Sequence, residues 1–166
     1  DEAGLKRELA GKVGPDGVAR ALAAAKADRV SRDHPGSLVI GSDQVVALGD
    51  TLIDKAVDLE DVRAQLRCLR GKTHRLFTAV ALAQDGRIVW TAADSASLTM
   101  RNFSEAFLDR YVAECGERLR QVAGAYEIEG SGIQLFERVD GDHFTIIGLP
   151  LVPLLAELRA LGALPA

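Results

Sequence analysis

The chain has 166 residues, 48% of them hydrophobic and 27% charged, so it can form one compact domain or two small lobes and is not wholly disordered. Twenty Lys and Arg against 24 Asp and Glu give a net charge of −4, which disfavours binding to duplex DNA through phosphate contacts. No apolar run approaches the roughly 18 residues that a membrane-spanning helix needs. Two cysteines make no disulfide framework, so a reduced, cytoplasmic setting is expected.

The N-terminal half predicts a helix, a strand and a second helix. The first helix follows Gly14-Pro15-Asp16 and ends at His34-Pro35-Gly36. Residues 37–41 predict a short buried strand, which residues 45–48 continue toward a turn. The second helix is expected from an N-cap at Asp58 to the next glycine.

The C-terminal half begins with a hairpin signal. Two β-rich runs, residues 73–83 and 87–99, are joined by Asp85-Gly86, a dipeptide that favours the tight turns of hairpins. Ser104 then caps a third helix.

A second hairpin is predicted next, with residues 133–139 and 143–147 paired across Asp140-Gly141, and a helix follows Gly148-Leu149-Pro150. Helices thus interleave with single strands and with hairpins. The expected fold class is therefore α/β with a mixed, twisted sheet flanked by helices, not a regular parallel βα repeat.

Three segments carry residue types suited to phosphate chemistry. Asp43 follows the predicted buried strand, where α/β enzymes place catalytic groups and metal ligands, although an ordinary turn aspartate is an equal alternative. Lys55, between a strand and a capped helix, can reach a phosphate as a point charge, or is merely solvated. Residues 123–132 hold three glycines among acids, which favours either an anion-binding loop or a flexible connection.

Together these segments suggest a phosphorylated ligand and a divalent metal.

Two other candidate sites are rejected. Gly71-Lys72-Thr73 mimics the end of a Walker A loop, but Leu66 stands where its first glycine is needed. The three histidines, His34, His74 and His143, have no zinc-ligand spacing.

A set of short motifs lies along the whole chain in a characteristic order. They are Asp1-Glu2, Ala25-Lys26-Ala27, Val39–Gln44, Asp54-Lys55, Leu69–His74, Ala123–Tyr126, Glu129-Gly130, Val139–Asp142 and Ile147–Pro150. In these motifs the chain strongly resembles the Maf family of nucleoside triphosphate pyrophosphatases. The resemblance implies a Maf/ITPase-like fold with two lobes and a cleft.

The resemblance also sets an expectation for the domain and its start. Residues 1–166 are expected to form a single Maf-like domain that lacks the family's N-terminal strand and Ser/Arg-rich phosphate-binding loop, which should precede Asp1. A second departure is Asp54-Lys55-Ala56, where the family usually has Gly-Lys-Pro. The lysine is kept and the rigid proline is lost.

The resemblance implies hydrolysis of the α–β phosphoanhydride of a nucleoside triphosphate, giving a monophosphate and pyrophosphate. Asp43 would be the proton acceptor that activates water, and Lys26 and Lys55 would neutralise the triphosphate. Glu2 and Asp43 would hold a divalent cation, with Mg²⁺ expected and Mn²⁺ or Co²⁺ as alternatives. Phosphoryl transfer rests mostly on positioning and charge stabilisation, so these residue types suffice.

Two positions resemble the family branch that prefers 7-methyl-GTP. The branch that acts on dTTP and UTP carries Thr after the catalytic Asp and Gln before the later Gly, whereas this chain has Gln44 and Glu129. Guanine presents two adjacent donors that a carboxylate can accept together. Methylation at N7 adds positive charge, which an anionic Glu129 favours further.

The sequence therefore predicts a cytoplasmic house-cleaning hydrolase whose partner is a nucleotide, with no nucleic acid or membrane partner and with a homodimer left open. A dTTP/UTP pyrophosphatase of the same family is one alternative. A non-catalytic nucleotide-binding regulator linked to cell division is another, although it would not need the combination of Asp43, Lys26 and Lys55.

Overall fold

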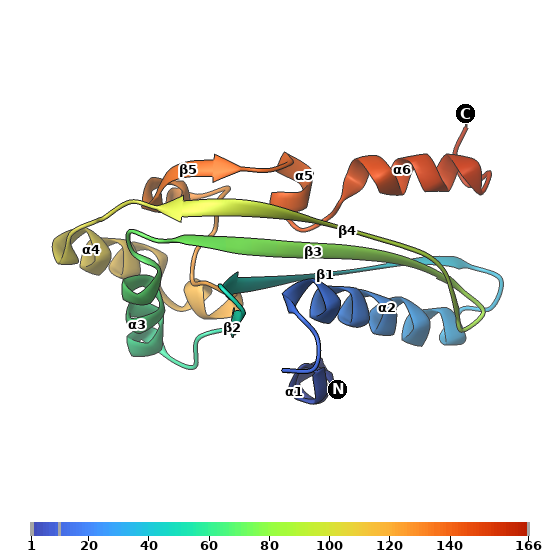
Figure 1. Cartoon of the computed structure of the whole chain (residues 1–166), viewed down its shortest axis with the longest axis horizontal. Helices are drawn as coiled ribbons and strands as arrows, with labels where there is room; N and C mark the ends of the chain where they lie inside the picture. The colour runs from blue at the N-terminus through green and yellow to red at the C-terminus, as the bar shows by residue number, and fades with distance from the viewer. Residues whose placement is uncertain (1, 10, 166) are drawn as a thin grey trace. The chain divides into compact units, whose positions relative to one another are not determined.

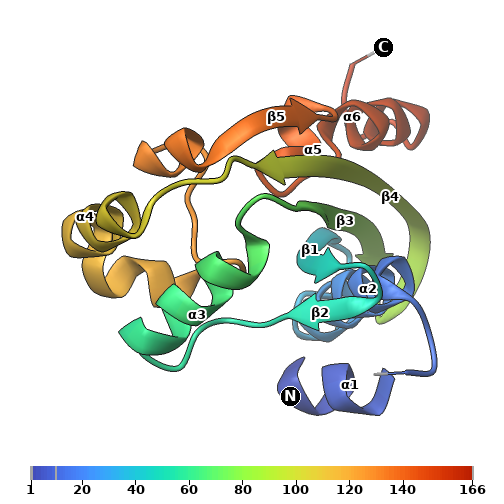
Figure 2. The same ribbon diagram turned by 60° about the vertical axis from the view of Figure 1, so that its left-hand side comes forward.

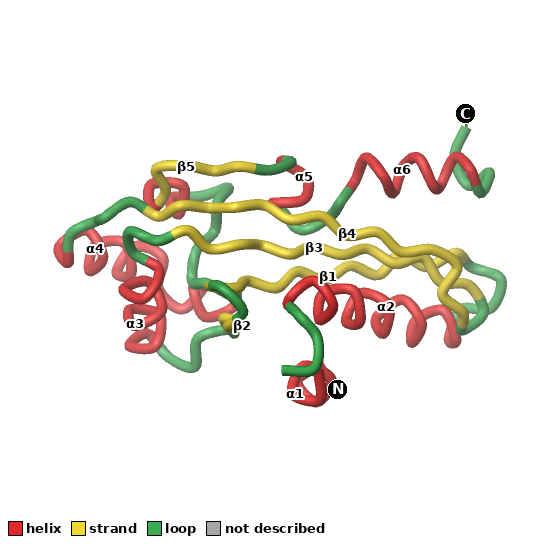
Figure 3. The backbone as a smooth tube through the Cα atoms, viewed as in Figure 1, coloured by secondary structure: helices red, strands yellow, loops and turns green. Residues whose placement is uncertain are grey.

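The computed structural model describes residues 2–9 and 11–165, except that the side chains at positions 2 and 3 lie outside the description. Figure 1 labels the helices and strands, and Figure 3 separates them by type. The α-helices are α1 (Glu2–Leu9), α2 (Pro15–Asp33), α3 (Leu59–Leu69), α4 (Glu105–Cys115), α5 (His143–Ile146) and α6 (Leu151–Ala160). The strands are β1 (Leu38–Leu48), β2 (Thr51–Ile53), β3 (Thr73–Gln84), β4 (Arg87–Met100) and β5 (Phe136–Asp140), and two 3₁₀ helices span Gly116–Gln121 and Ser131–Leu135.

The strands form one five-stranded sheet in the order β2-β1-β3-β4-β5. β1 pairs antiparallel with β2 in a register that sets Val46 opposite Ile53, and β4 pairs antiparallel with β5, Leu98 opposite Val139. The expected α/β class, a sheet accompanied by helices, is confirmed.

The chain divides into two compact units, in keeping with the expectation of two lobes. Unit 1 comprises the residues up to 44, residues 77–95 and the residues from 142 on; unit 2 comprises residues 45–76 and 96–141. The cleft stays a prediction.

In unit 1, helix α2 packs directly against the first half of β1 (Figures 1 and 2). Pro15 at the first helical position and Asp16 in the first turn start the helix. A Cβ atom added at Gly41 of β1 would lie 2.5 Å from the carbonyl oxygen of Ala23 and 2.6 Å from the backbone nitrogen of Ala27. Glycine is therefore required for the helix backbone to approach the strand this closely.

β1 corrects the predicted position of Asp43. The sequence predicts a buried strand that ends at Gly41, with Asp43 after it, but β1 is continuous and holds Asp43 in its interior. The polar residues at positions 42–44 do not end the strand, because contacts with other elements satisfy their side chains on both faces. Gly41 accommodates α2 on one face, and Ser42 and Gln44 donate hydrogen bonds on the other.

The predicted second hairpin is wrong in its second arm. Residues 143–146 form the short helix α5, whose N-cap Asp142 accepts a hydrogen bond from the backbone N–H of Thr145 at 2.9 Å. Residues 136–140 of the predicted first arm form β5, which pairs with β4. Thr145 of α5 bonds to two other strands: its carbonyl oxygen accepts from Thr78 of β3 at 2.9 Å, and its hydroxyl donates to Asp94 of β4 at 3.0 Å.

The C-terminal helix α6 covers part of the unit 1 core. Leu154 is buried with Val80 and Leu82 of β3, and Trp90 and Leu158 pack against this cluster.

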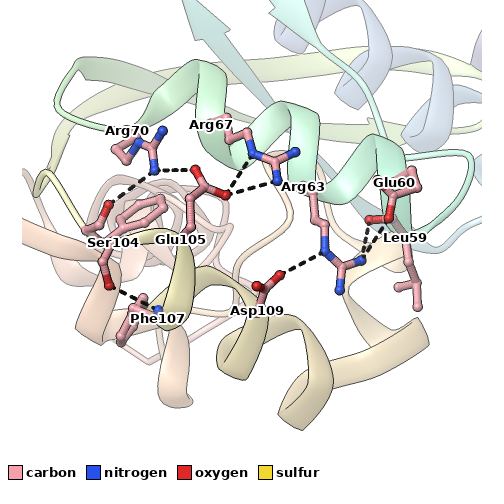
Figure 4. Close-up of polar contacts among 10 residues, drawn as sticks. Leu59, Glu60, Arg63, Arg67, Arg70, Ser104, Glu105, Phe107 and Asp109 are labelled. Carbon is pink, nitrogen blue, oxygen red and sulfur yellow. Dashed lines mark hydrogen bonds and ion pairs between the residues drawn. The ribbon is translucent and has the colours of Figure 1, made fainter.

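Local signals predicted the helices of unit 2 correctly. Asp58 caps α3 by accepting from the N–H of Asp61, and Ser104 caps α4 by accepting from the N–H of Phe107. Figure 4 shows the ion pairs that join these helices: Glu105 of α4 binds both Arg67 of α3 (3.0 Å) and Arg70 (2.7 Å), the residue that follows α3. Hydrogen bonds from these two guanidinium groups lower the pKa of Glu105.

The contact at Gly41 predicts a large cost for adding one methyl group. Gly41→Ala forces backbone against backbone, so the free energy of unfolding should fall by about 1–3 kcal/mol, as for other overpacked sites. Urea unfolding measures this change. Gly130→Ala is the matched control, because its Cβ would lie 3.7 Å from the nearest atom, an ordinary contact. Equal stability of the two variants would contradict the close approach.

Candidate functional site

In unit 1 the structure brings Lys26 and Asp43 together. Asp43 projects from β1 toward α2, and its side chain is only 6% exposed. The Lys26 ammonium donates a hydrogen bond to Asp43 Oδ1, while the Lys26 side chain remains 43% exposed. A buried carboxylate needs a compensating charge, which Lys26 supplies here. The pair thus combines an acceptor shielded from bulk solvent with a cation that a ligand can reach.

Gln44 lies next to Asp43 in sequence but on the opposite face of β1, because successive side chains in a strand alternate. Its side-chain nitrogen donates to Thr78 Oγ1 at 2.7 Å and to the carbonyl oxygens of Thr145 and Ile146 at 3.0 and 3.1 Å. The structure therefore does not bring the Gln44 and Asp43 side chains together.

In unit 2, Lys55 is joined through its backbone to the glycine-rich loop. It follows β2 and forms an isolated antiparallel bridge with Ala123. The Lys55 side chain is exposed and, within the described part of the chain, makes no ion pair or hydrogen bond. A fixed backbone with an exposed ammonium suits the expected contact with phosphate.

The loop after Ala123 has a constrained backbone. Gly124 has φ +80°, and a Cβ there would lie 2.7 Å from the Tyr126 ring. Ala125 has φ +58°, a conformation that costs energy for a residue other than glycine and is enriched at functional sites. The loop is therefore held in one shape by its surroundings.

Glu129 stands at an exposed turn of the same segment. The N–H of Gly130 donates to the carbonyl oxygen of Glu127 at 3.1 Å, and a Cβ at Gly132 would lie 2.5 Å from that oxygen. Among the residues that the structure describes, none forms an ion pair or hydrogen bond with the Glu129 carboxylate. A tightly folded backbone thus presents a carboxylate that can accept from a ligand.

The His74–Tyr126 pair is not predicted from the sequence, in which His74 is one of three histidines without zinc-ligand spacing. His74 is 1% exposed, and its Nε2 lies 2.7 Å from the Tyr126 hydroxyl. Burial lowers the pKa of His74 to about 4, so the imidazole is neutral at pH 7, and burial raises the pKa of Tyr126. The available signal was the alternation at the start of β3, where His74 and Leu76 are buried between exposed Thr73 and Arg75.

The predicted metal ligands are only partly described. Asp43 is placed, whereas the side chain of Glu2, at the start of α1, lies outside the described residues. Among the described side chains, residues 4–9 and 11–165, no group of three or more His, Cys, Asp or Glu side chains could hold a metal ion. Mg²⁺ is commonly held by one or two carboxylates, substrate phosphates and water, so a single placed carboxylate is compatible with that ion.

A family match and the names of similar proteins agree on the kind of protein that this chain resembles. Residues 2–161 match the family described as Maf-like protein. A 7-methyl-GTP pyrophosphatase of Rhizobium johnstonii is 52% identical over 90% of this chain and 75% of its own length, and one of Mesorhizobium japonicum is 48% identical over 99% and 83%. A nucleoside triphosphate pyrophosphatase of Caulobacter vibrioides is 53% identical over 94% and 78%.

The buried neutral imidazole predicts a pH-dependent stability. The pKa of His74 is about 4 in the folded chain and about 6.5 when unfolded. Between these values the unfolded state binds more protons, so the free energy of unfolding falls as the pH drops below about 6.5. The loss reaches about 3 kcal/mol at pH 4, and His74 has no effect above that window.

Urea unfolding of the wild type and His74→Phe between pH 7 and pH 4 tests this. The variant should be less stable at pH 7, because it leaves the Tyr126 hydroxyl without its partner, but should lose less stability on acidification. His34→Asn, at an exposed position, is the control and should follow the wild type. A His74→Phe curve parallel to the wild-type curve would refute a neutral His74.

Proposed function

We propose that this chain, which belongs to the Maf family, is a nucleoside triphosphate pyrophosphatase that converts 7-methyl-GTP to its monophosphate and pyrophosphate. The observation that carries the proposal is the pairing of buried Asp43 with partly exposed Lys26. It provides a proton acceptor beside a cation, the combination that phosphoanhydride hydrolysis needs.

The reaction needs no covalent intermediate on the protein. Asp43 accepts a proton from a water molecule as the water oxygen bonds to the α-phosphorus. The bond between that phosphorus and the oxygen bridging to the β-phosphorus breaks, and pyrophosphate leaves with the electron pair. Lys26, exposed enough to contact phosphate oxygens, and Lys55 oppose the negative charge that grows on the leaving group.

A divalent cation completes the proposal, with Mg²⁺ first and Mn²⁺ or Co²⁺ as alternatives. When bound it neutralises triphosphate charge and polarises the phosphoryl oxygens. Asp43 and Glu2 would hold it, and most remaining ligands would be phosphate oxygens and water.

Glu129 supports a guanine substrate. Its carboxylate is exposed on a tightly folded loop and can accept from both N1–H and the N2 amino group of guanine. Several of the relatives at 46–52% identity are named 7-methyl-GTP pyrophosphatases. A carboxylate also favours the positive charge that N7 methylation adds to the ring.

We further propose that the enzyme acts in the cytoplasm, on free nucleotides. No helix in the described part of the chain is both long and apolar enough to cross a membrane. Preference for dTTP or UTP, and tight binding without turnover, are the outcomes that would favour the alternative pyrophosphatase or the regulator.

Asp43→Asn should lower kcat for pyrophosphate release by about 10²–10⁴-fold, since the amide cannot accept the proton from water. The assay uses the full-length gene product with Mg²⁺. Asp16→Asn is the matched control: Asp16 is also ion-paired, to Arg20 at 2.8 Å, but lies near the start of α2. Turnover of Asp43→Asn within a few-fold of wild type would overturn the mechanism.

Glu129→Gln should change base preference more than it changes turnover. An amide donor beside guanine's donors removes one of two hydrogen bonds, so the ratio of kcat/KM for 7-methyl-GTP over dTTP should fall about 10- to 100-fold, in line with about 1–3 kcal/mol per bidentate contact. Glu137→Gln, exposed on β5, is the control. An unchanged ratio would remove Glu129 from base recognition.

A further inference from the structure

The segment that carries Glu129 is a short turn closed by its own backbone. The N–H of Gly130 donates to the carbonyl oxygen of Glu127 at 3.1 Å, so Glu129 is the third of the four residues 127–130 that form the turn. A Cβ at Gly132 would lie 2.9 Å from the backbone nitrogen of Glu127, so the chain after the turn packs directly against the chain before it. The direction of the Glu129 carboxylate therefore depends on what holds the two ends of this turn.

Helix α4 holds the first end of the turn through Tyr111. The Tyr111 hydroxyl donates to the carbonyl oxygen of Ala125 at 3.5 Å and also hydrogen-bonds with the backbone of Glu127. Tyr111 is 3% exposed and Ala125 is 0% exposed, so both partners are shielded from bulk solvent. Ala125 has φ +58°, a conformation that persists only where the surroundings enforce it, and Tyr111 is part of those surroundings.

Cys115, one helical turn further along α4, holds the second end. Its Sγ lies 3.2 Å from Oγ of Ser131, the residue that follows the turn, and Cys115 is 6% exposed. Residues four apart in a helix lie on the same face, and the side chains of Tyr111 and Cys115 also hydrogen-bond with each other. The two side chains thus contact the chain two residues before Glu129 and two residues after it.

Packing alone does not explain the polar atom of Tyr111. Its ring stacks on Phe107 of the same helix, with the ring centroids 6.3 Å apart and the planes at 5°. A phenylalanine at position 111 would keep this stacking. The hydroxyl is explained by the backbone of residues 125–127, to which it is directed.

We propose that Tyr111 and Cys115 are positioning residues for base recognition, which hold the turn in the shape that the Glu129 carboxylate needs to accept from two donors of one base. Two parallel hydrogen bonds require a fixed direction, because a carboxylate that turns away keeps only one of them. A turn held before binding also avoids an ordering cost on binding. This inference rests on the proposed function, since it takes Glu129 as the group that reads the base.

Positioning of Glu129 and general support of the fold have different kinetic signatures. A loosened turn weakens the binding of the base, so KM for 7-methyl-GTP rises while kcat stays, because the contacts to the reacting phosphorus are unchanged. Damage to the fold lowers kcat for 7-methyl-GTP and dTTP alike. The ratio of kcat/KM values for 7-methyl-GTP over dTTP, read together with kcat, therefore separates the two roles.

Three variants each remove one anchoring group. Tyr111→Phe removes the hydroxyl and keeps the ring. Cys115→Ala and Ser131→Ala remove the same contact from its two sides, and Ser131 is only partly buried, so this variant leaves the core intact. Cys115→Ser keeps a group that can donate and accept, and is the rescue variant.

Cys68→Ala and Thr99→Val are the matched controls in unit 2. Cys68 is exposed on α3, so the first control makes the cysteine change away from α4. Thr99 lies on β4, and its hydroxyl is hydrogen-bonded to that of Thr73 at 2.8 Å. The second control therefore removes a hydrogen-bonded hydroxyl within the sheet.

In the full-length protein with Mg²⁺, Tyr111→Phe, Cys115→Ala and Ser131→Ala should each lower the preference ratio about 3- to 10-fold, the scale of one hydrogen bond. The change should lie in KM for 7-methyl-GTP, with kcat within about 2-fold of the wild type. Cys115→Ser should recover most of the ratio, and both controls should match the wild type. An unchanged ratio in Tyr111→Phe or Cys115→Ala, or an equal loss of kcat for both nucleotides, would overturn the proposal.

A double-mutant cycle links the effect to Glu129. In the Glu129→Gln background, adding Tyr111→Phe or Cys115→Ala should change the ratio by less than about 2-fold, because the carboxylate that they position is gone. A full additional fall in the ratio would show that the two side chains act independently of Glu129, and the positioning role would be wrong.

Amide hydrogen exchange gives a readout that needs no turnover. Exchange over residues 127–131 should accelerate about 5-fold or more in Tyr111→Phe and Cys115→Ala and stay unchanged in Cys68→Ala, provided that thermal unfolding shows each variant folded. If the wild type hydrolyses no nucleotide, the proposed function fails, and exchange alone then decides whether α4 holds the turn. Unchanged exchange in Tyr111→Phe and Cys115→Ala refutes the anchoring in either case.

Discussion

A carboxylate in the interior of a strand imposes the central constraint on unit 1. Asp43 is almost wholly buried, so an opposite charge must come to it from a neighbouring element. Helix α2 brings Lys26 close enough only because Gly41, two residues earlier on the same face of β1, has no Cβ to keep the helix backbone away. The packing of one helix on one strand thus assembles the proposed reaction centre, and the same contact contributes to the stability of the unit.

Because side chains alternate along a β-strand, the proposed reactive residue of β1 and the residues that bind β3 and α5 lie on opposite faces. On one face of β1, Gly41 and Asp43 meet α2; on the other, Ser42 and Gln44 bind β3 and the segment around α5. The anchored face consists of partly buried hydrogen bonds, which fix geometry well because an alternative arrangement would leave polar groups unpaired. The reactive face keeps one partly exposed cation, so a ligand can still reach it.

In unit 2, the backbone at Lys55 and in the glycine-rich loop is fixed, whereas the side chains of Lys55 and Glu129 make no ion pair or hydrogen bond with the described residues. Lys55 is tied by its backbone to Ala123, and the following loop holds Ala125 at a positive φ. His74 of β3 contacts this loop at the ring and hydroxyl of Tyr126. A ligand that binds Lys55 and Glu129 would therefore spend little free energy on ordering the chain, which is the advantage of a preorganised site.

Local chemistry in the sequence was enough to determine the caps at Asp58 and Ser104 and the Asp85-Gly86 turn, because each depends on residues within one turn of chain. The ordered motifs also determined the family and the residues proposed for the chemistry. Only the tertiary structure decided that β1 continues through Asp43 and that residues 143–146 form a helix. Both outcomes depend on partners distant in sequence: contacts with α2, β3 and α5 satisfy a polar run that would otherwise end a strand, and Thr145 of α5 bonds to Thr78 and Asp94. The buried state of His74 was decided in the same way, because burial depends on which elements pack together.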